Sequence, residues 1–394
     1  MNALKNNKKF VSIVVPALNE ELTIGEFVQW CKEGLKSADV EGEILIMDSS
    51  TDRTVQIVES LGARAIKVSK RGLGQAYIEA IPYIRGEYVI MGDCDLTYDF
   101  RELKLFIDKL NAGMDFVMGT RMGGYIEKGS MPKLHQYLGI PVTTFILNLL
   151  YGSRYSDIHC GMRAITLDAF KRINLESRSW EYASEMVLKA AVLKFKTAEV
   201  PIKFYKNREG RLSHHKRIGW FSPWYAAWIN LKVMFLYAPS FFLMLPGRLS
   251  MWLGLFAVIV LLVKGHVLFL SIHGMLLGIT LAVVGYSALQ MGILSKLVYD
   301  FDPRDTLKYK KIFSYNKGVI AGGFLIAIGL MILLNFMFAY IKNGFILREI
   351  SRFALMGLLL IILGFQTFTF TLVFQMILNR NKGILEKLPG PKDE

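Results

Sequence analysis

Apolar and polar residues follow two different patterns along this 394-residue chain, and the change comes near Asn230. Before that point, short apolar runs alternate with segments of helical periodicity. This alternation is typical of an α/β domain in which a parallel sheet carries helices on both faces. We expect buried strands at Val11–Val15, Glu43–Met47, Ala65–Val68, Glu87–Met91 and Asp115–Met118, and helices at Glu20–Lys36, Arg53–Leu61, Leu73–Ile84 and Phe100–Ala112.

After Asn230, long apolar stretches dominate, and a stretch of about 20 such residues can cross a bilayer. Four membrane helices are expected, near Ser250–Leu270, Met275–Val298, Gly318–Ile341 and Phe353–Leu378. Just before them, Lys216–Leu236 mixes aromatic and basic residues, as in a helix that lies in the bilayer interface. A helix packed on the soluble domain is the alternative. The predicted division is a soluble domain at 1–215, interfacial helices at 216–247, a membrane domain at 248–380 and a tail at 381–394.

The formal net charge of +14 modifies this picture in one respect, which is orientation. The loop Tyr299–Lys317 and the C-terminal tail are basic, so both should face the cytoplasm. The N-terminus is polar and lacks a signal-peptide pattern, so the soluble domain should stay in the cytoplasm too, on the cytoplasmic membrane. The three cysteines have no metal-ligand spacing. No nucleic-acid partner is expected, because no recognition helix, zinc finger or stacking motif accompanies the charge.

The predicted strand at Glu87–Met91 leads directly into two carboxylates, Asp93 and Asp95. If the strand continues, alternate residues share a face, and the two side chains point the same way. Carboxylates at such a place suit a divalent cation, because proteins hold Mg²⁺ with one or two carboxylates plus substrate phosphates. An acidic turn without a ligand is the alternative for this pair taken alone.

Polar residues also follow the first two strands, and ligands of parallel sheets bind beyond these carboxyl ends. Pro16, Asn19 and Glu20 lie where a helix should begin, so Asn19 could bind a ligand or simply cap the helix. Asp48 is placed to accept hydrogen bonds from a nucleobase or ribose. Asp52 is expected to cap the next helix.

A third group precedes the helix at Leu73. Lys70 and Arg71 with Gly72 and Gly74 place two cations and two glycines at a helix start, which favours a pyrophosphate near Arg71, Gly72 and Gly74. Tyr77 stands where a dinucleotide fingerprint needs a small residue, so that motif is excluded.

Four motifs in this order closely resemble those of family 2 glycosyltransferases with the GT-A fold, a Rossmann-like α/β fold. They are Pro16-Ala-Leu-Asn-Glu20, Asp48-Ser-Ser-Thr-Asp52-Arg-Thr54, Arg71-Gly-Leu-Gly74 and Asp93-Cys-Asp95, and the resemblance, over about Val11–Gly247, is to polyprenyl-phosphate sugar transferases of the dolichyl-phosphate-mannose synthase type. It implies a nucleotide-sugar donor bordered by Pro16, Asn19, Glu20 and Asp48. Asp93 would hold ribose or metal, and Asp95 a Mg²⁺ or Mn²⁺ ion on the donor pyrophosphate. Ser49 departs from the aspartate common in relatives, which leaves UDP and GDP open.

On the acceptor side, Ser156–Arg163 looks like the family's acceptor motif. Asp157 is expected to orient or deprotonate the acceptor, and Glu185 is the second choice. The segment Arg208–Lys216 resembles the basic segment that meets a lipid phosphate. The residues expected to contact that phosphate are Arg121, Arg163, Arg211, Ser213 and Lys216. A phosphate monoester has a second pKa of about 6 and needs little help from a base.

The sequence therefore predicts a metal-dependent, inverting glycosyltransferase that moves a sugar from a nucleotide donor to a polyprenyl phosphate at the cytoplasmic membrane face. Transfer to another membrane glycolipid and a non-catalytic nucleotide-sugar-binding scaffold are the alternatives. A processive polysaccharide synthase fits less well, because the chain has no Gln-x-x-Arg-Trp signature. The four spans could also form a homo-oligomer interface.

Overall fold

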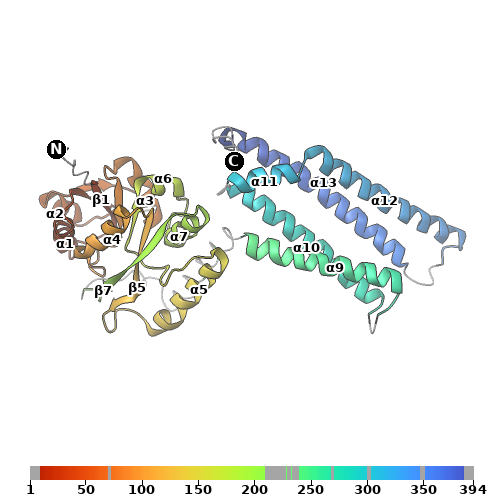
Figure 1. The fold of residues 1–394 in the computed structure, drawn as a ribbon, viewed down its shortest axis with the longest axis horizontal. Helices are drawn as coiled ribbons and strands as arrows, with labels where there is room; N and C mark the ends of the chain where they lie inside the picture. The colour runs from red at the N-terminus through yellow and green to blue at the C-terminus, as the bar shows by residue number, and fades with distance from the viewer. Residues whose placement is uncertain are drawn as a thin grey trace, which may run out of the picture. The chain divides into compact units, whose positions relative to one another are not determined.

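The structure is a computed structural model that describes residues 9–69, 72–208, 228, 232, 239–267, 270–299, 303–346 and 351–385. The chain divides into two compact units, residues 1–234 and 235–394 (Figure 1). Each unit is described by itself.

The first unit is built on a seven-stranded sheet with the order β3-β2-β1-β4-β6-β5-β7. Four strands are parallel neighbours, namely β1 (Val11–Ala17), β2 (Gly42–Asp48), β3 (Arg64–Lys67) and β4 (Tyr88–Met91). The other three are β5 (Phe116–Ile126), β6 (Arg163–Thr166) and β7 (Thr197–Phe204). All five expected strands are present.

The sequence pattern predicts a parallel sheet, and the pairings among β1 to β4 are parallel, but the complete sheet is mixed. Strand β6 runs antiparallel to both of its neighbours, β4 and β5, whereas β7 is parallel to β5. The sequence gives little warning of β6, because its four residues, Arg-Ala-Ile-Thr, form neither an apolar run nor an alternating pattern.

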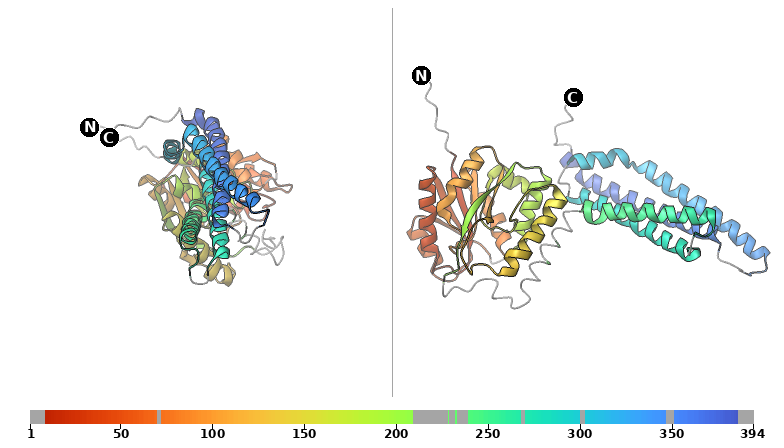
Figure 2. Two further views of the ribbon diagram at one scale, coloured as in Figure 1. Left: turned by 90° about the vertical axis from the view of Figure 1, so that its right-hand side faces the viewer. Right: turned by 60° about the horizontal axis from the view of Figure 1, so that its bottom comes forward.

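Helices enclose the sheet in two groups (Figure 2). In one group α1 (Ile24–Ser37) packs beside α2 (Thr54–Ser60) and α4 (Leu103–Asn111). In the other, α7 (Tyr182–Val192) packs beside α3 (Leu73–Ala80), α5 (Ile140–Tyr151) and α6 (Leu167–Ile173). The four expected helices are present but shorter, and 3₁₀ turns at Ile81–Tyr83 and Phe100–Glu102 account for two of the missing ends.

The hydrophobic core explains why the central strands are so apolar. In β1, Val11, Ile13, Val14 and Val15 are 0% exposed, and β4 is buried along its length. A strand covered on both faces needs apolar side chains on both, so it reads as a continuous run. This core fixes the carboxyl ends of β1, β2 and β4 next to one another.

The second unit consists of long apolar helices. They are α9 (Leu245–Lys264), α10 (Ile272–Tyr299), α12 (Tyr315–Lys342) and α13 (Arg352–Leu385), with the short basic helix α11 (Pro303–Ile312) between the two pairs. A π-helical turn, Ser240–Met244, extends α9 toward its N-terminus.

Within the described ranges, four helices are long and apolar enough to span a membrane, as expected: Ser240–Lys264, Ile272–Val298, Tyr315–Lys342 and Arg352–Arg380. The first differs from the expected Ser250–Leu270. It ends at Lys264 because Gly265 takes a left-handed φ of 81°, which terminates the helix.

Glycines bring the membrane helices together in pairs. A Cβ atom on Gly254 of α9 would lie 2.4 Å from the Ala282 nitrogen of α10, and one on Gly322 of α12 would lie 2.8 Å from the Gly364 oxygen of α13. Small residues permit such close backbone contact, which drives helix association where no hydrophobic effect is available. Between the pairs, the Gln366 side-chain amide donates to the Ser287 hydroxyl at 2.7 Å.

Candidate active site

The loops that follow β1, β2 and β4 are joined to one another at one edge of the sheet. The Asn19 backbone amide donates to the Ser50 hydroxyl at 2.8 Å, and the Thr51 backbone amide donates to the side-chain oxygen Oδ1 of Asn19 at 2.9 Å. On the other side, the Cys94 thiol donates to the Pro16 carbonyl at 3.4 Å. The three expected groups at Pro16–Glu20, Asp48 and Asp93–Asp95 therefore belong to one continuous rim.

Asn19 acts as a link in this rim. Its φ of 57° lies in the left-handed region, which Asn tolerates better than most residues. Helix α1 begins only at Ile24, so Asn19 is too far away to be the helix cap that the sequence left open.

Asp48 is the most unusual group of the site. Its side chain is 0% exposed, and Oδ2 accepts a hydrogen bond from the Ser50 amide at 3.0 Å. Oδ1 is also buried and has no hydrogen-bond partner among the described residues. A buried oxygen without a partner is costly, so its presence at the open edge of a sheet calls for a donor that a ligand would bring.

Glu20 and Asp52 have well-defined partners. The Glu20 amide donates to the Thr54 hydroxyl at 3.0 Å, and the Thr23 hydroxyl donates to Glu20 Oε2 at 3.1 Å. Asp52 Oδ1 accepts from the Thr54 backbone amide at 3.0 Å at the start of α2, although the N-cap position of this helix is Arg53 rather than Asp52. Burial raises the pKa of Asp52, but the hydrogen bonds from Thr54 outweigh it and hold the pKa below its usual value.

Asp93 and Asp95 follow β4, which ends at Met91, so the loop rather than strand alternation places them. Both are partly exposed. Asp95 Oδ1 accepts from the Thr97 amide at 3.1 Å. Asp93 faces Gly161, since a Cβ atom there would lie 2.9 Å from Asp93 Oδ2.

The residues around Asp93 fit a cation that a substrate helps to hold. In the part of the chain that the structure describes, no three or more His, Cys, Asp or Glu side chains cluster as a complete metal site. Asp93 and Asp95 follow β4 at the same edge of the sheet as Asp48. Two such carboxylates are the protein ligands expected for a Mg²⁺ ion when substrate phosphates supply the remaining ligands.

Gly72 and Gly74 contact another loop of the protein. A Cβ atom on Gly72 would lie 2.4 Å from the Arg178 oxygen, and one on Gly74 would lie 2.1 Å from the Ser177 oxygen. The Gln75 amide, in the first turn of α3, donates to the Arg178 oxygen at 2.9 Å. Packing against this loop is sufficient to explain both glycines, and their contact with a pyrophosphate stays a prediction.

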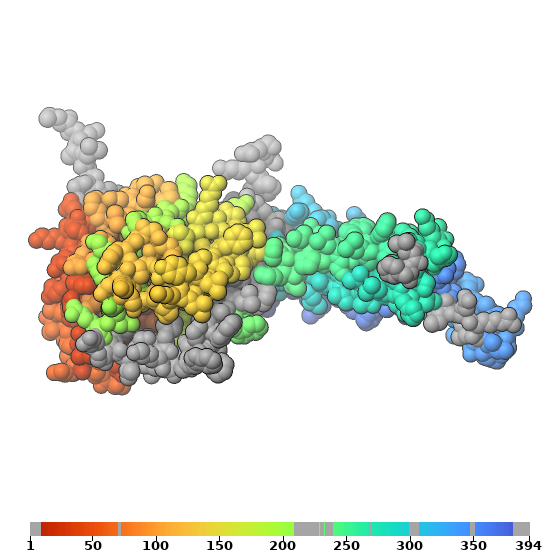
Figure 3. All heavy atoms as spheres, turned by 90° about the horizontal axis from the view of Figure 1, so that it is seen from below, coloured from red at the N-terminus to blue at the C-terminus, as the bar shows by residue number. Residues whose placement is uncertain are grey.

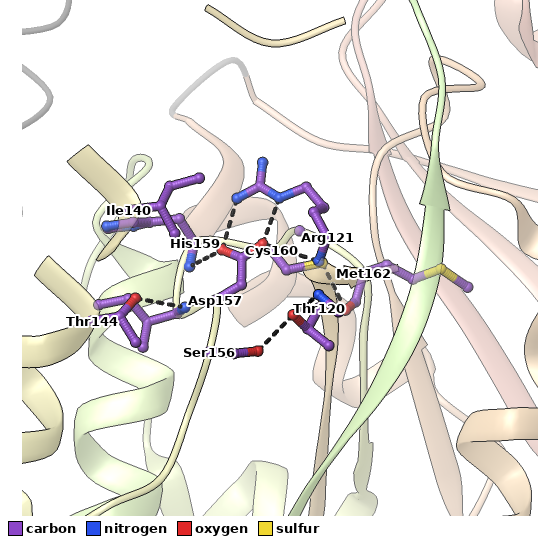
Figure 4. Close-up of polar contacts among 12 residues, drawn as sticks. Thr120, Arg121, Ile140, Thr144, Ser156, Asp157, His159, Cys160 and Met162 are labelled. Carbon is purple, nitrogen blue, oxygen red and sulfur yellow. Dashed lines mark hydrogen bonds and ion pairs between the residues drawn. The ribbon is translucent and has the colours of Figure 1, made fainter. Parts of the chain in front are cut away.

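Arg121 and Asp157, which the sequence predicts on the acceptor side, form a buried ion pair (Figure 4). Arg121 Nε lies 2.6 Å from Asp157 Oδ2, and Nη2 lies 2.9 Å from Oδ1. The Arg121 amide also donates to Oδ2 at 3.2 Å, and the His159 amide donates to Oδ1 at 3.2 Å. Asp157 is 0% exposed and Arg121 is 7% exposed.

The charges of this pair are fixed by their proximity. Burial raises the pKa of Asp157, but the attraction of Arg121 outweighs it and holds the pKa below its usual value. Burial lowers the pKa of Arg121, but the attraction of Asp157 outweighs burial and holds the pKa above its usual value. Asp157 is therefore an ionised group that accepts four hydrogen bonds. Because its oxygens are already occupied, it is better placed to orient Arg121 than to remove a proton from an acceptor.

His159 connects this pair to helix α5. Its Nε2 atom lies 2.8 Å from the Thr143 hydroxyl. Burial lowers the pKa of His159 to about 4, although Asp157 attracts the protonated form. The ring is neutral near pH 7.

Glu185 and Arg163 are buried in the protein and are held by its backbone. Glu185 Oε1 accepts from the Glu176 amide at 2.9 Å, Oε2 accepts from the Ser177 amide at 2.7 Å, and Lys189 Nζ lies 2.5 Å from Oε1. Arg163 donates to the carbonyls of Ala183 at 2.9 Å and Cys160 at 2.5 Å. All three charged side chains are at most 1% exposed.

Four of the predicted site residues, Arg71, Arg211, Ser213 and Lys216, lie outside the described residues, as does most of Lys216–Leu236. Conversely, the sequence did not single out Tyr98 or Glu199. The Gly161 amide donates to the Tyr98 hydroxyl at 2.9 Å, and the Ser156 amide donates to Glu199 Oε1 at 2.8 Å. Both contacts join segments far apart in the chain, so no local pattern could have revealed them.

Comparison with known proteins defines the class. Residues 12–174 match the model described as "Glycosyl transferase family 2", and residues 293–378 match "Glycosyltransferase family 2 C-terminal transmembrane region". The chain belongs to glycosyltransferase family 2, and it is a multi-pass membrane protein. Family membership and the mixed α/β sheet agree with the predicted GT-A fold.

Individual relatives make the likeness more specific. The low-salt glycan biosynthesis hexosyltransferase Agl6 of Haloferax volcanii is 32% identical over 365 residues, which cover 90% of this chain and 86% of the relative. The dolichyl-phosphate hexose transferase of the same organism is 31% identical over 206 residues, and the match covers 51% of this chain and 84% of that relative. Among solved structures, glucosyl-3-phosphoglycerate synthase from Mycobacterium tuberculosis, in complex with phosphoglyceric acid, is 18% identical with a TM-score of 0.45, and the match covers 58% of this chain and 80% of that one.

Proposed function

We propose that this glycosyltransferase transfers a hexose from a nucleoside-diphosphate sugar to a polyprenyl phosphate at the cytoplasmic face of the membrane, with inversion at the anomeric carbon. The observation that carries the donor half is the buried, unpartnered Oδ1 of Asp48 among the described residues. The names of two relatives, a hexosyltransferase and a dolichyl-phosphate hexose transferase, support the sugar class and the acceptor class.

The nucleoside of the donor would lie against the rim formed by the loops after β1 and β2. A base N–H or a ribose hydroxyl would donate to Asp48 Oδ1 and satisfy it. Pro16, Asn19 and Glu20 would border the same pocket, with Asn19 holding the two loops in register. Arg71, Gly72 and Gly74 would lie beside the pyrophosphate.

Asp93 and Asp95 would hold a Mg²⁺ or Mn²⁺ ion, and Asp93 could also contact the ribose. Such an ion supplies Lewis-acid stabilisation of the charge on the departing nucleoside diphosphate. The protein's own contribution is to fix the two carboxylates, Asp95 through the Thr97 amide and Asp93 against Gly161.

The positive charge of Arg121 would attract the acceptor phosphate, and Asp157 would orient the Arg121 guanidinium through its two hydrogen bonds. One phosphate oxygen forms the new bond to the anomeric carbon, and the bond from that carbon to the donor pyrophosphate breaks with its electron pair. Because a phosphate monoester is largely ionised at neutral pH, the step needs positioning and cations more than a base. Arg163, Arg211, Ser213 and Lys216 are the other proposed phosphate contacts, although the burial of Arg163 leaves it a supporting role.

Orientation rests on the positive-inside rule. Helix α11, between the second and third candidate spans, contains Lys308, Lys310 and Lys311 and should face the cytoplasm. An even number of spans then keeps the N-terminal unit and the C-terminus on that same side. Homo-oligomer formation through the spans stays a prediction.

A donor screen tests this proposal. Purified protein in detergent, with Mg²⁺ or Mn²⁺, is offered radiolabelled UDP- and GDP-hexoses and undecaprenyl phosphate. We expect one donor to pass label into the organic phase, and both chelator and Asp95→Ala to abolish the transfer. The Asp108→Asn variant, at an exposed position on α4, is the control. Transfer that is unchanged in Asp95→Ala would contradict the metal role. Label that appears on a co-purified glycolipid instead of undecaprenyl phosphate would contradict the proposed acceptor.

A further inference from the structure

Helix α5 and the π-helical turn before it, His135–Gly139, lie at the surface of the first unit, where they appear in yellow (Figure 3). Together with Leu134 they present a large apolar face there. Six side chains form this face, and each is between 45% and 71% exposed: Leu134, Tyr137, Leu138, Val142, Phe145 and Leu149. Their spacing of three and four residues places them along one side of a helix. We call this set the α5 outer face.

The polar side chains of α5 lie on the opposite side, where they bond to the protein. Thr143 contacts His159 at 2.8 Å, and the Thr144 hydroxyl accepts from the Ile158 amide at 3.5 Å. The Asn148 side-chain amide donates to the Tyr155 carbonyl at 2.8 Å. A surface helix of a water-soluble domain has the reverse arrangement, with its polar side chains in solvent.

In the segment that contains the α5 outer face, the Lys, Arg, Asp and Glu side chains between Glu127 and Asp157 are all basic. Lys128, Lys133 and Arg154 are exposed at its two ends. No aspartate or glutamate occurs in the sequence between Glu127 and Asp157. Anionic lipid headgroups attract such a basic border.

We infer that the α5 outer face inserts into the interfacial region of a lipid bilayer, as a membrane contact separate from the four candidate spans. The arrangement has the parts of an interfacial helix: an apolar face, a tyrosine whose ring suits the headgroup level, and basic residues at the border. The chain is a multi-pass membrane protein, so a bilayer is always available to this unit.

Such a contact has a consequence for the site. Thr143 and Thr144 join α5 directly to the segment that contains Asp157 and His159. A bilayer that holds α5 would therefore hold the Arg121–Asp157 pair close to the headgroups. The inference does not depend on the proposed acceptor, because it needs only that the protein resides in a membrane.

Depth measurements on the full chain test this inference. The native cysteines Cys31, Cys94 and Cys160 are buried, so a single added cysteine can be labelled selectively. Leu138→Cys and Phe145→Cys would be labelled with an environment-sensitive fluorophore in nanodiscs of phosphatidylcholine and phosphatidylglycerol. The controls are Leu22→Cys and Tyr83→Cys, at apolar positions of the same unit that are 70% and 43% exposed.

We expect blue-shifted emission that doxyl-labelled lipids quench at positions 138 and 145, and water-like emission without such quenching at positions 22 and 83. Emission at 138 and 145 that aqueous iodide quenches and doxyl lipids do not would overturn the inference. Blue-shifted emission without doxyl quenching would overturn it as well, because protein rather than lipid would then cover this face. Neither result would affect sugar transfer in detergent, which tests the proposed function separately.

Discussion

The guanidinium of Arg121 meets the carboxylate of Asp157 at two points, Nε to Oδ2 at 2.6 Å and Nη2 to Oδ1 at 2.9 Å, inside the protein. Replacing Asp157 by Asn would leave Arg121 buried without its counter-charge. Breaking a buried pair in this way costs about 3–5 kcal/mol. We expect Asp157→Asn to lower the melting temperature in detergent and to reduce sugar transfer together.

The matched control for this pair is Asp168→Asn. Asp168 also faces an arginine, Arg172 at 3.6 Å, but its side chain is 81% exposed. Exposed pairs contribute about 0–1 kcal/mol, so this variant should melt like the wild type. Equal melting temperatures for Asp157→Asn and the wild type would show that the buried pair does not stabilise the unit.

His159 predicts a pH dependence of stability. Its pKa is lowered to about 4 by burial, whereas an unfolded histidine has a pKa of about 6.5. Between these values the unfolded chain binds a proton that the folded protein does not, so stability falls as the pH decreases from 6.5 to 4. Melting temperatures recorded across this range should fall less steeply for His159→Gln. Parallel curves for the two proteins would contradict the lowered pKa.

Glu185 and Lys189 allow a catalytic base to be distinguished from a structural pair. Glu185 holds the amides of Glu176 and Ser177, and this loop packs on Gly72 and Gly74. Glu185→Gln alone would leave the buried Lys189 without the carboxylate that lies 2.5 Å from it, and should lower stability by about 3–5 kcal/mol.

The double variant Glu185→Gln with Lys189→Met decides between the two roles. The double variant removes both charges, so we expect it to recover much of the stability and of the maximal transfer rate. The KM for the donor should be higher if the loop at Glu176 and Ser177 has moved. A double variant that is stable yet inactive at saturating donor would instead identify Glu185 as the base.

Two adjacent glycines of α12 test the packing of the membrane helices. A Cβ atom on Gly322 would lie 2.8 Å from the Gly364 oxygen, whereas one on Gly323 would meet no described atom within 4 Å. Gly322→Leu should therefore separate α12 from α13 and lower the melting temperature in detergent. Gly323→Leu, with the same change of composition, should not. Similar melting curves for both variants would contradict the close pairing of these helices.

The sequence predicted those parts of the fold whose cause is local. Strands β1, β2 and β4 are largely buried, so each appears in the sequence as an apolar run. The four candidate membrane spans are each longer than the helices described in the first unit, so their apolar stretches were recognisable. Strand β6 was not predicted, because its four residues have no strand pattern of their own, and its antiparallel direction depends on its neighbours β4 and β5.

The site was predictable as a set of residues but only in part as a set of contacts. Asp157 was recognised from its motif, yet its ion pair with Arg121, 36 residues away, depends on the folded sheet. Gly72 and Gly74 looked like a phosphate loop, whereas the structure packs them against the loop at Ser177 and Arg178. Apolar spacing predicts a helical face but does not say whether protein, water or lipid covers it, which is why the α5 outer face emerged only from the structure.

The most direct test of the account is the dependence of transfer on donor concentration in Asp48→Asn. The variant keeps the shape of the side chain but removes the charge that would accept a donor hydrogen bond. Hydrogen bonds to charged groups are worth about 1.5–3 kcal/mol, so kcat/KM for the nucleotide sugar should fall about tenfold or more. The KM for the polyprenyl phosphate should stay near that of the wild type. An unchanged kcat/KM for the donor would contradict the placement of the nucleoside at Asp48, and with it the observation on which the proposed function rests.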